Sequence, residues 1–157
     1  MPIEDSFSKW VDKIARTIPG FNGYYRKEER RENDERLRVK ISKKLEYIEE
    51  VLNEKGRRVT KSEDLSLLDK IGRIEKKLEK LKDSIRYANY GYSGFFDQKE
   101  VSEGTLRSIY KADIELLGWI QDFESTSGVD TELDLITENI QKGFDLLLRR
   151  SEIIEGD

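Results

Sequence analysis

The sequence contains no cysteine and no histidine, and it has only two prolines among 157 residues. Without cysteine the chain forms no disulfides and offers no thiolate nucleophile, and the common zinc sites need one or both of the missing residue types. Histidine is also the usual general base near neutral pH and the usual ligand of di-iron sites in helical bundles. These absences exclude most enzyme classes, so we expect a non-enzymatic protein with no cofactor and no bound metal.

Long apolar runs are also missing, because no stretch approaches the roughly 20 residues that span a bilayer. The N-terminus lacks the basic region, apolar stretch and small-residue cleavage site of a signal peptide, so we expect a cytoplasmic protein. No linker rich in proline, glycine or serine divides the chain, and residues 1–157 are expected to form a single domain. Charged residues make up 39% of the chain, which is typical of long helices with solvent-exposed faces.

Apolar residues recur at spacings of three and four in successive segments, a pattern that predicts helices. We expect helices over about 6–18, 24–55, 61–90, 102–124 and 130–154. Gly56 is placed where a C-cap glycine belongs, and Thr60 or Ser62 would cap the next helix, with Glu63 completing a capping box with Thr60. The short connections predict an all-α fold, an antiparallel up-down-up-down four-helix bundle with an additional short N-terminal amphipathic helix.

The predicted second and third helices share a heptad seam that becomes charged at one end. The seam of the third helix is apolar throughout and consists of Leu67, Ile71, Ile74, Leu78, Leu81, Ile85, Ala88 and Tyr92. In the second helix the seam is apolar from Ile41 to Leu52, but the preceding seam positions are Tyr24, Lys27, Arg31, Asp34 and Arg38. A symmetric hairpin sets this charged half against the stretch RYANYGYSGFFD, residues 86–97.

A further charge lies on the apolar face of the segment 102–124, where Asp113 is seven residues from both Leu106 and Ile120. A carboxylate there needs a partner, and arginine matches its planar geometry best. Candidate partners are Arg30, Arg31, Arg38 and Arg86.

These residues define a candidate polar and aromatic patch: Arg31, Asp34, Arg38, Arg86, Tyr90, Tyr92 and Asp113. One interpretation is an internal ion-pair network that closes one end of the bundle. The other is a groove in which Arg31, Arg86 and the tyrosines bind an anionic ligand or a partner peptide. Gly91 and Gly94 are predicted to take positive φ at the end of the third helix, while Tyr90, Phe95 and Phe96 cover the bundle end.

The N-terminal segment is a candidate interface helix, because Phe7, Trp10, Val11, Ile14 and Ile18 fall on one side of it. Packing across the bundle or across a homodimer is favoured over a membrane surface, since Asp5 and Asp12 would repel anionic lipids. The chain is also asymmetric in charge. Residues 113–157 carry twelve acids and three bases, a net −9, which leaves +5 for the preceding residues.

Two other kinds of chemistry have weaker support. Glu29, Glu32 and Glu35 form ExxE spacings of the type that holds Mg²⁺ in all-helical nucleotide pyrophosphohydrolases, but no second acidic motif lies on a later helix. Ion pairs with the interleaved arginines and lysines are favoured instead. The aromatics of residues 86–97 suit single-stranded nucleic acid, but the acidic chain with few nearby bases disfavours that partner.

The pairing of PGFNGYYRKEERRENDERL with RYANYGYSGFFD resembles a group of uncharacterised all-helical prokaryotic proteins over residues 19–113. The resemblance implies a helical fold, and it identifies neither an activity nor a functional residue. From the residues, we expect a bundle that acts through contacts with an unknown protein partner, as an adaptor or a homo-oligomer subunit. The alternatives are an anionic-ligand-binding bundle or Mg-dependent phosphate-processing enzyme using Arg31, Asp34, Arg86 and Tyr90, and a peripheral membrane protein attached through its N-terminal helix.

Overall fold

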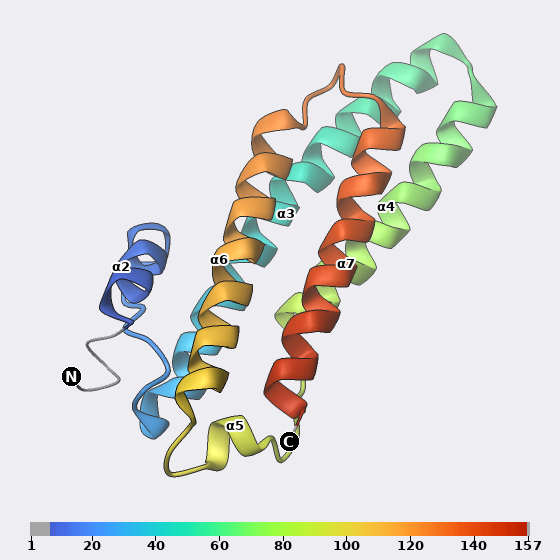
Figure 1. Ribbon diagram of the computed structural model, residues 1–157. Helices are drawn as coiled ribbons and strands as arrows, with labels where there is room; N and C mark the ends of the chain where they lie inside the picture. Colours follow the sequence, from blue (N-terminus) through green and yellow to red (C-terminus); the bar gives the residue numbers. More distant parts are fainter. Residues whose placement is uncertain (1–6, 157) are drawn as a thin grey trace.

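The computed structural model describes residues 7–156 and contains helices but no strand within that range (Figure 1). The helices are α2 (Ser8–Thr17), α3 (Lys27–Ser62), α4 (Leu65–Arg86), α5 (Gly94–Asp97), α6 (Glu103–Thr126) and α7 (Leu133–Glu155). The prediction of an all-α fold is therefore confirmed for the described part of the chain. Residue 6, the expected start of the first helix, and both ends of the expected domain lie outside the described residues.

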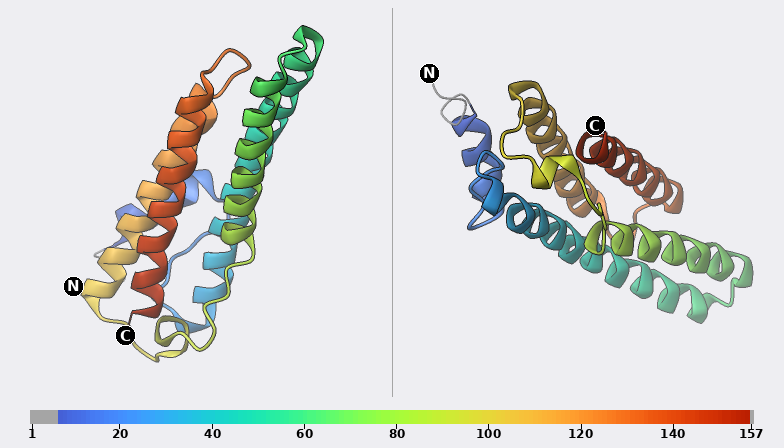
Figure 2. Two further views of the ribbon diagram at one scale, coloured as in Figure 1. Left: turned by 90° about the vertical axis from the view of Figure 1, so that its right-hand side faces the viewer. Right: turned by 90° about the horizontal axis from the view of Figure 1, so that it is seen from below.

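The helices pack as a bundle around one apolar core (Figures 1 and 2). α3 lies beside α4, α6 lies beside α7, and the two pairs meet where α3 packs on α6 and α4 packs on α7. Each long helix contributes fully buried side chains to the core, such as Leu45, Leu78, Ile120 and Ile140. The short α5 contacts α7 and α3 and closes one end of the bundle (Figure 2).

The connection between α3 and α4 lies further along the chain than predicted. α3 does not end near Lys55 but continues through Gly56 to Ser62, and Glu63 takes the left-handed conformation with φ 62°. The first residue of α4 follows Asp64, whose carboxylate accepts a hydrogen bond from the backbone of Leu67 at 3.1 Å. Thr60 and Ser62 do not cap α4, because their hydroxyls donate to carbonyls within α3. A single interior glycine costs about 1 kcal/mol, which the surrounding helix formers offset.

The end of α4 also differs from the prediction. α4 ends at Arg86 rather than near residue 90, and the exposed fraction of Tyr92 is 102%, so Tyr92 is no part of the seam. Gly91 has φ 56°, as predicted, but Gly94 has no positive φ and instead begins α5. Ser93 caps α5 by accepting from the backbone of Phe95, a local signal that the heptad pattern does not contain.

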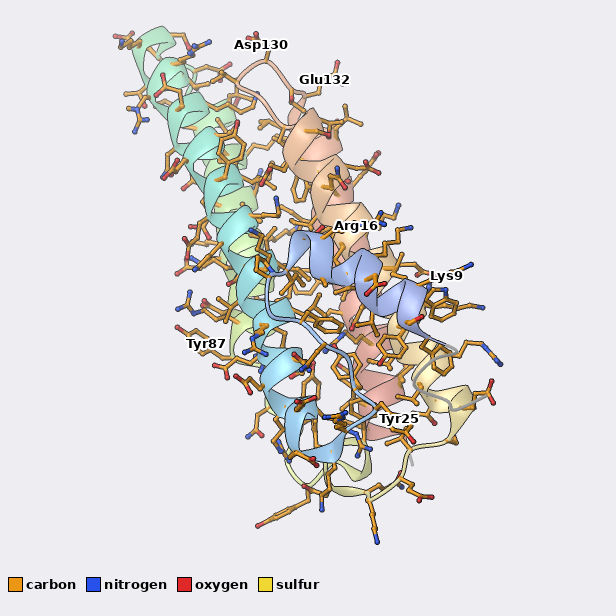
Figure 3. The ribbon with its side chains drawn as sticks, turned by 90° about the vertical axis from the view of Figure 1, so that its left-hand side faces the viewer. Lys9, Arg16, Tyr25, Tyr87, Asp130 and Glu132 are labelled. Atoms are coloured by element: carbon orange, nitrogen blue, oxygen red, sulfur yellow. The ribbon has the colours of Figure 1, made fainter. Side chains whose placement is uncertain are left out.

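The apolar side of α2 packs on α6 of the same chain (Figure 3). Phe7, Ile14 and Ile18 are buried, and Trp10 and Val11 pack against the core. The Phe7 ring centroid lies 5.4 Å from that of Tyr110 on α6. The apolar stripe predicted as an interface is thus covered within the chain. Among residues 7–156, moreover, no helix has the length and apolar character needed to cross a bilayer.

Candidate functional site: a buried arginine, carboxylate and tyrosine cluster

Arg150 of α7 lies at the centre of a buried polar cluster where the long helices meet. Its side chain is 1% exposed, and its Nε donates to Oδ1 of the fully buried Asp113 on α6 at 2.7 Å. Its Nη1 lies 2.6 Å from Oδ1 of Asp34 on α3. This second contact is an ion pair without hydrogen-bond geometry, because that oxygen has no hydrogen-bond partner within the described residues. One guanidinium therefore holds carboxylates from two other helices.

Two tyrosines and a second arginine complete the cluster. The Tyr24 hydroxyl donates to Oδ2 of Asp113 at 2.5 Å and accepts from Nη2 of Arg150 at 3.1 Å. The Tyr90 hydroxyl accepts from Nη1 of Arg150 at 3.1 Å. Arg38 donates from Nε to Oδ2 of Asp34 at 3.0 Å and from Nη1 to the carbonyl of Arg86 at 2.6 Å. We call Tyr24, Asp34, Arg38, Tyr90, Asp113 and Arg150 the buried cluster; its two arginines balance its two carboxylates.

Burial and charge act in opposite directions on the ionisable groups of the buried cluster. Burial raises the pKa of Asp113, and the charge of Arg150 opposes that rise. Burial lowers the pKa of Arg150, but the carboxylates of Asp113 and Asp34 outweigh this effect and hold that pKa well above its usual range. Burial, followed by the charge of Asp113, raises the pKa of the Tyr24 hydroxyl well above its ordinary value. Arg150 therefore stays charged, and Tyr24 stays a hydrogen-bond donor.

The raised pKa of Tyr24 predicts a loss of stability in alkaline solution. The folded state keeps a proton that the unfolded chain releases near pH 10, so the contribution of this group is complete below about pH 10 and falls above it. Between about pH 9 and 11.5, the free energy of unfolding should fall more steeply with pH for the wild type than for Tyr24→Phe. Urea titrations at each pH measure both slopes. Equal slopes would show that Tyr24 does not keep its proton in the folded state.

Arg30 is a second buried arginine, fully enclosed beside the buried cluster. It binds backbone carbonyls: Nε donates to Tyr24 at 2.7 Å, Nη2 to Tyr25 at 3.2 Å, and Nη1 to Phe95 at 3.1 Å and Gln98 at 2.5 Å. Burial lowers the pKa of Arg30. The residue ties the segment before α3 to α5 and so closes the end of the bundle below the buried cluster.

The structure brings together only part of the predicted patch. Asp34, Arg38, Tyr90 and Asp113 belong to the buried cluster, whereas Arg31, Arg86 and Tyr92 lie outside it. Arg31 is exposed above the Phe96 ring, 4.5 Å from its centroid, and lies 3.6 Å from Asp97. Arg86 lies 3.7 Å from Glu46 of α3.

The predicted partners of Asp113 were wrong. None of the four candidate arginines binds it, and Arg150, which does, was not predicted. A signal for Arg150 was present in the sequence, because Ile140, Leu147 and Ile154 continue the seven-residue spacing of α7 and Arg150 occupies the position between the last two. A charge in a seam position on one helix therefore pairs with a charge in a seam position on another.

The cavities at this end are lined by residues outside the buried cluster. One of about 380 Å³ is bordered by Tyr25, Lys99, Glu100 and Val101, and one of about 270 Å³ is bordered by Lys27, Glu28, Arg31, Phe96 and Asp97. Within residues 7–156, no group of three or more acids lies close enough to hold a metal ion. Of the ExxE residues, Glu32 pairs with Arg36 at 2.7 Å, an i,i+4 contact.

Comparisons with known proteins do not assign this chain to a family. No family model, curated protein or solved structure matches the chain. This result is consistent with the resemblance to an uncharacterised all-helical family.

Proposed function

We propose that the protein is a non-enzymatic helical bundle that acts in the cytoplasm through protein–protein contacts, as an adaptor or a subunit of a homo-oligomer. The arrangement proposed with it is an antiparallel up-down-up-down order of α3, α4, α6 and α7. The short connections within the side-by-side pairs α3–α4 and α6–α7 support that order.

The observation that carries the proposal is that the reactive groups of the candidate site are partners of one another. Arg150, Asp113 and Asp34 are at most 2% exposed and are held by side chains of the same chain. A general acid, a base or an anion-binding arginine must reach its substrate, and these groups are enclosed. The burial of Asp34 and Tyr90 therefore disfavours the phosphate-processing and ligand-binding alternatives that use them, and the covered apolar side of α2 disfavours the membrane alternative.

The surface around the buried cluster is instead suited to a protein partner. Tyr25, Tyr87 and Tyr92 are exposed, and Tyr25 and Tyr87 both lie in the lower half of Figure 3, on opposite sides of the view. Arg31 is also exposed. Tyrosine and arginine are the residue types enriched where protein interfaces concentrate their binding energy. These three exposed tyrosines are the contact surface that we propose for another protein.

Site-specific photocrosslinking in the native cell tests the proposal. A photoreactive phenylalanine analogue at position 92 should give a discrete adduct of higher mass, because the side chain points fully into solvent at the proposed contact surface. The same analogue at Tyr47, an exposed tyrosine of α3, is the matched control and should give no such adduct. Absence of a discrete protein adduct at positions 25, 87 and 92, from a chain that is also monomeric in solution at every concentration, would contradict the proposed function.

A further inference from the structure

One flank of α4 carries a row of basic side chains. Lys82 pairs with Glu49 of α3 at 2.9 Å, and Lys70 pairs with Asp134 of α7 at 2.9 Å, so these two lysines mark the flanks of α4 that face α3 and α7. With about 100° of rotation per residue, the flank next to α7 carries Lys70, Arg73, Lys77 and Lys80. Lys77 and Lys80 are exposed and have no ion-pair partner within the described residues. We call these four residues the basic row.

The outward side of α7 carries the opposite charge. Arg149 pairs with Glu115 at 2.9 Å, and this contact marks the flank of α7 that faces α6. The outermost positions, between that flank and α4, are Asp134, Glu138, Asp145 and Glu152, and all four are exposed. We call these residues the acidic row. The charge asymmetry of the sequence thus becomes two parallel rows of opposite sign on adjacent helices.

Apolar side chains lie between the two rows. Leu148 is 61% exposed, and Phe144, one turn away, is only partly buried against the core. Both lie on the side of α7 turned toward α4, because the opposite side is taken up by contacts with α6 such as that of Arg149. The left view of Figure 2 looks onto this face, with α4 and α7 side by side.

We propose that the α4–α7 face binds the same face of a second copy of this chain. A two-fold axis near Leu148 sets the basic row of each copy against the acidic row of the other, while Leu148 and Phe144 of both copies form the apolar centre. The face is complementary to itself because it carries both signs of charge, and this favours a second copy over other partners. A membrane or nucleic acid would be repelled by the acidic row. The inference deepens the proposed function and rests on it.

Solution mass by light scattering over a concentration range tests the contact with the full chain. The wild type should approach twice the 18.5 kDa chain mass as concentration rises. Leu148→Lys should weaken dimerisation at least about tenfold, because it places like charges together at the axis and removes apolar contact. Leu135→Lys is the matched control: Leu135 is 48% exposed on the flank of α7 toward α6 and should leave the dimer unchanged. A monomer at every concentration, or a dimer insensitive to Leu148→Lys, would overturn the inference.

Charge reversal supplies an independent test of the pairing. Lys77→Glu with Lys80→Glu leaves the basic row with two bases and two acids, and Glu138→Lys with Glu152→Lys does the same to the acidic row. Each variant alone therefore loses the attraction between the rows of two copies and should be monomeric. An equimolar mixture should regain a dimer containing one chain of each kind. The unchanged acidic row of the first variant then meets the unchanged basic row of the second, and the introduced glutamates face the row that carries the introduced lysines. A mixture that stays monomeric would overturn the proposed pairing. Failure here while position 92 still crosslinks to another protein removes only the homodimer, whereas a monomer that also gives no adduct at positions 25, 87 and 92 counts against the proposed function itself.

Discussion

Replacing Arg150 with methionine is expected to lower the free energy of unfolding by about 3–5 kcal/mol. The change preserves much of the side-chain length but leaves Asp113 and Asp34 buried without their shared cation. Removing one partner of a buried ion pair lowers stability because the remaining charge is desolvated and no longer has the opposite charge that offset its lost hydration. Urea unfolding followed by circular dichroism measures the difference.

The neighbouring Arg149 supplies the control for this prediction. Its pair with Glu115 is more than half exposed on the arginine side, so Arg149→Met should change stability by less than about 1 kcal/mol. Adding Asp113→Asn to Arg150→Met should recover part of the loss, because it removes the buried charge of Asp113, which has lost Arg150, whereas Asp34 keeps its pair with Arg38 at 3.0 Å. Equal losses for the two arginine variants would show that the buried cluster contributes nothing specific to stability.

Gly143→Ala is expected to destabilise the protein by about 1–3 kcal/mol, although alanine is the better helix former. An added Cβ would lie 2.6 Å from Cη2 of Trp119 and 2.9 Å from Cδ2 of Leu81, well inside van der Waals contact. Trp119 has little freedom to move, because its Nε1 donates to the carbonyl of Asn139 at 2.9 Å and its ring packs on Phe123. Thermal and urea unfolding should both report the loss.

The same substitution at Gly118 should have the opposite sign. Gly118 lies on the exposed side of α6, and an added Cβ there meets no atom within 4 Å. Gly118→Ala should therefore stabilise by up to about 1 kcal/mol through helix propensity alone. If both variants were stabilised, α7 would not approach Trp119 as closely as the structure places it.

The helices could be predicted because their apolar periodicity is strong and local. Leu78, Ile120 and Ile140 each recur with neighbours at spacings of three and four, and all three are buried in the structure. The position of the α3–α4 turn could not be obtained in this way. Gly56 carries the signature of a helix end, but helix formers on both sides and a better N-cap at Asp64 carry α3 past it.

The polar site was only half predictable for a related reason. The cost of a lone carboxylate on an apolar face identifies Asp113 from its own helix. Its partner depends on how the helices are placed in space, and periodicity within one helix does not contain that information. Tyr92 was assigned to the site by extending the seam of α4 beyond Arg86, where the helix ends. The first error is one of tertiary geometry, and the second is one of helix length.

Arg30 binds the backbone carbonyls of its neighbours, so these contacts do not depend on which side chains the neighbours carry. Every residue type at positions 25 and 98 has a backbone carbonyl, so the hydrogen bonds from Arg30 persist after substitutions that would break a contact between side chains. The side chains at positions 25 and 98 can therefore change during evolution while the hydrogen bonds of Arg30 keep this end of the bundle closed. The same property makes positions 25 and 98 suitable sites for a randomised library on an unchanged scaffold.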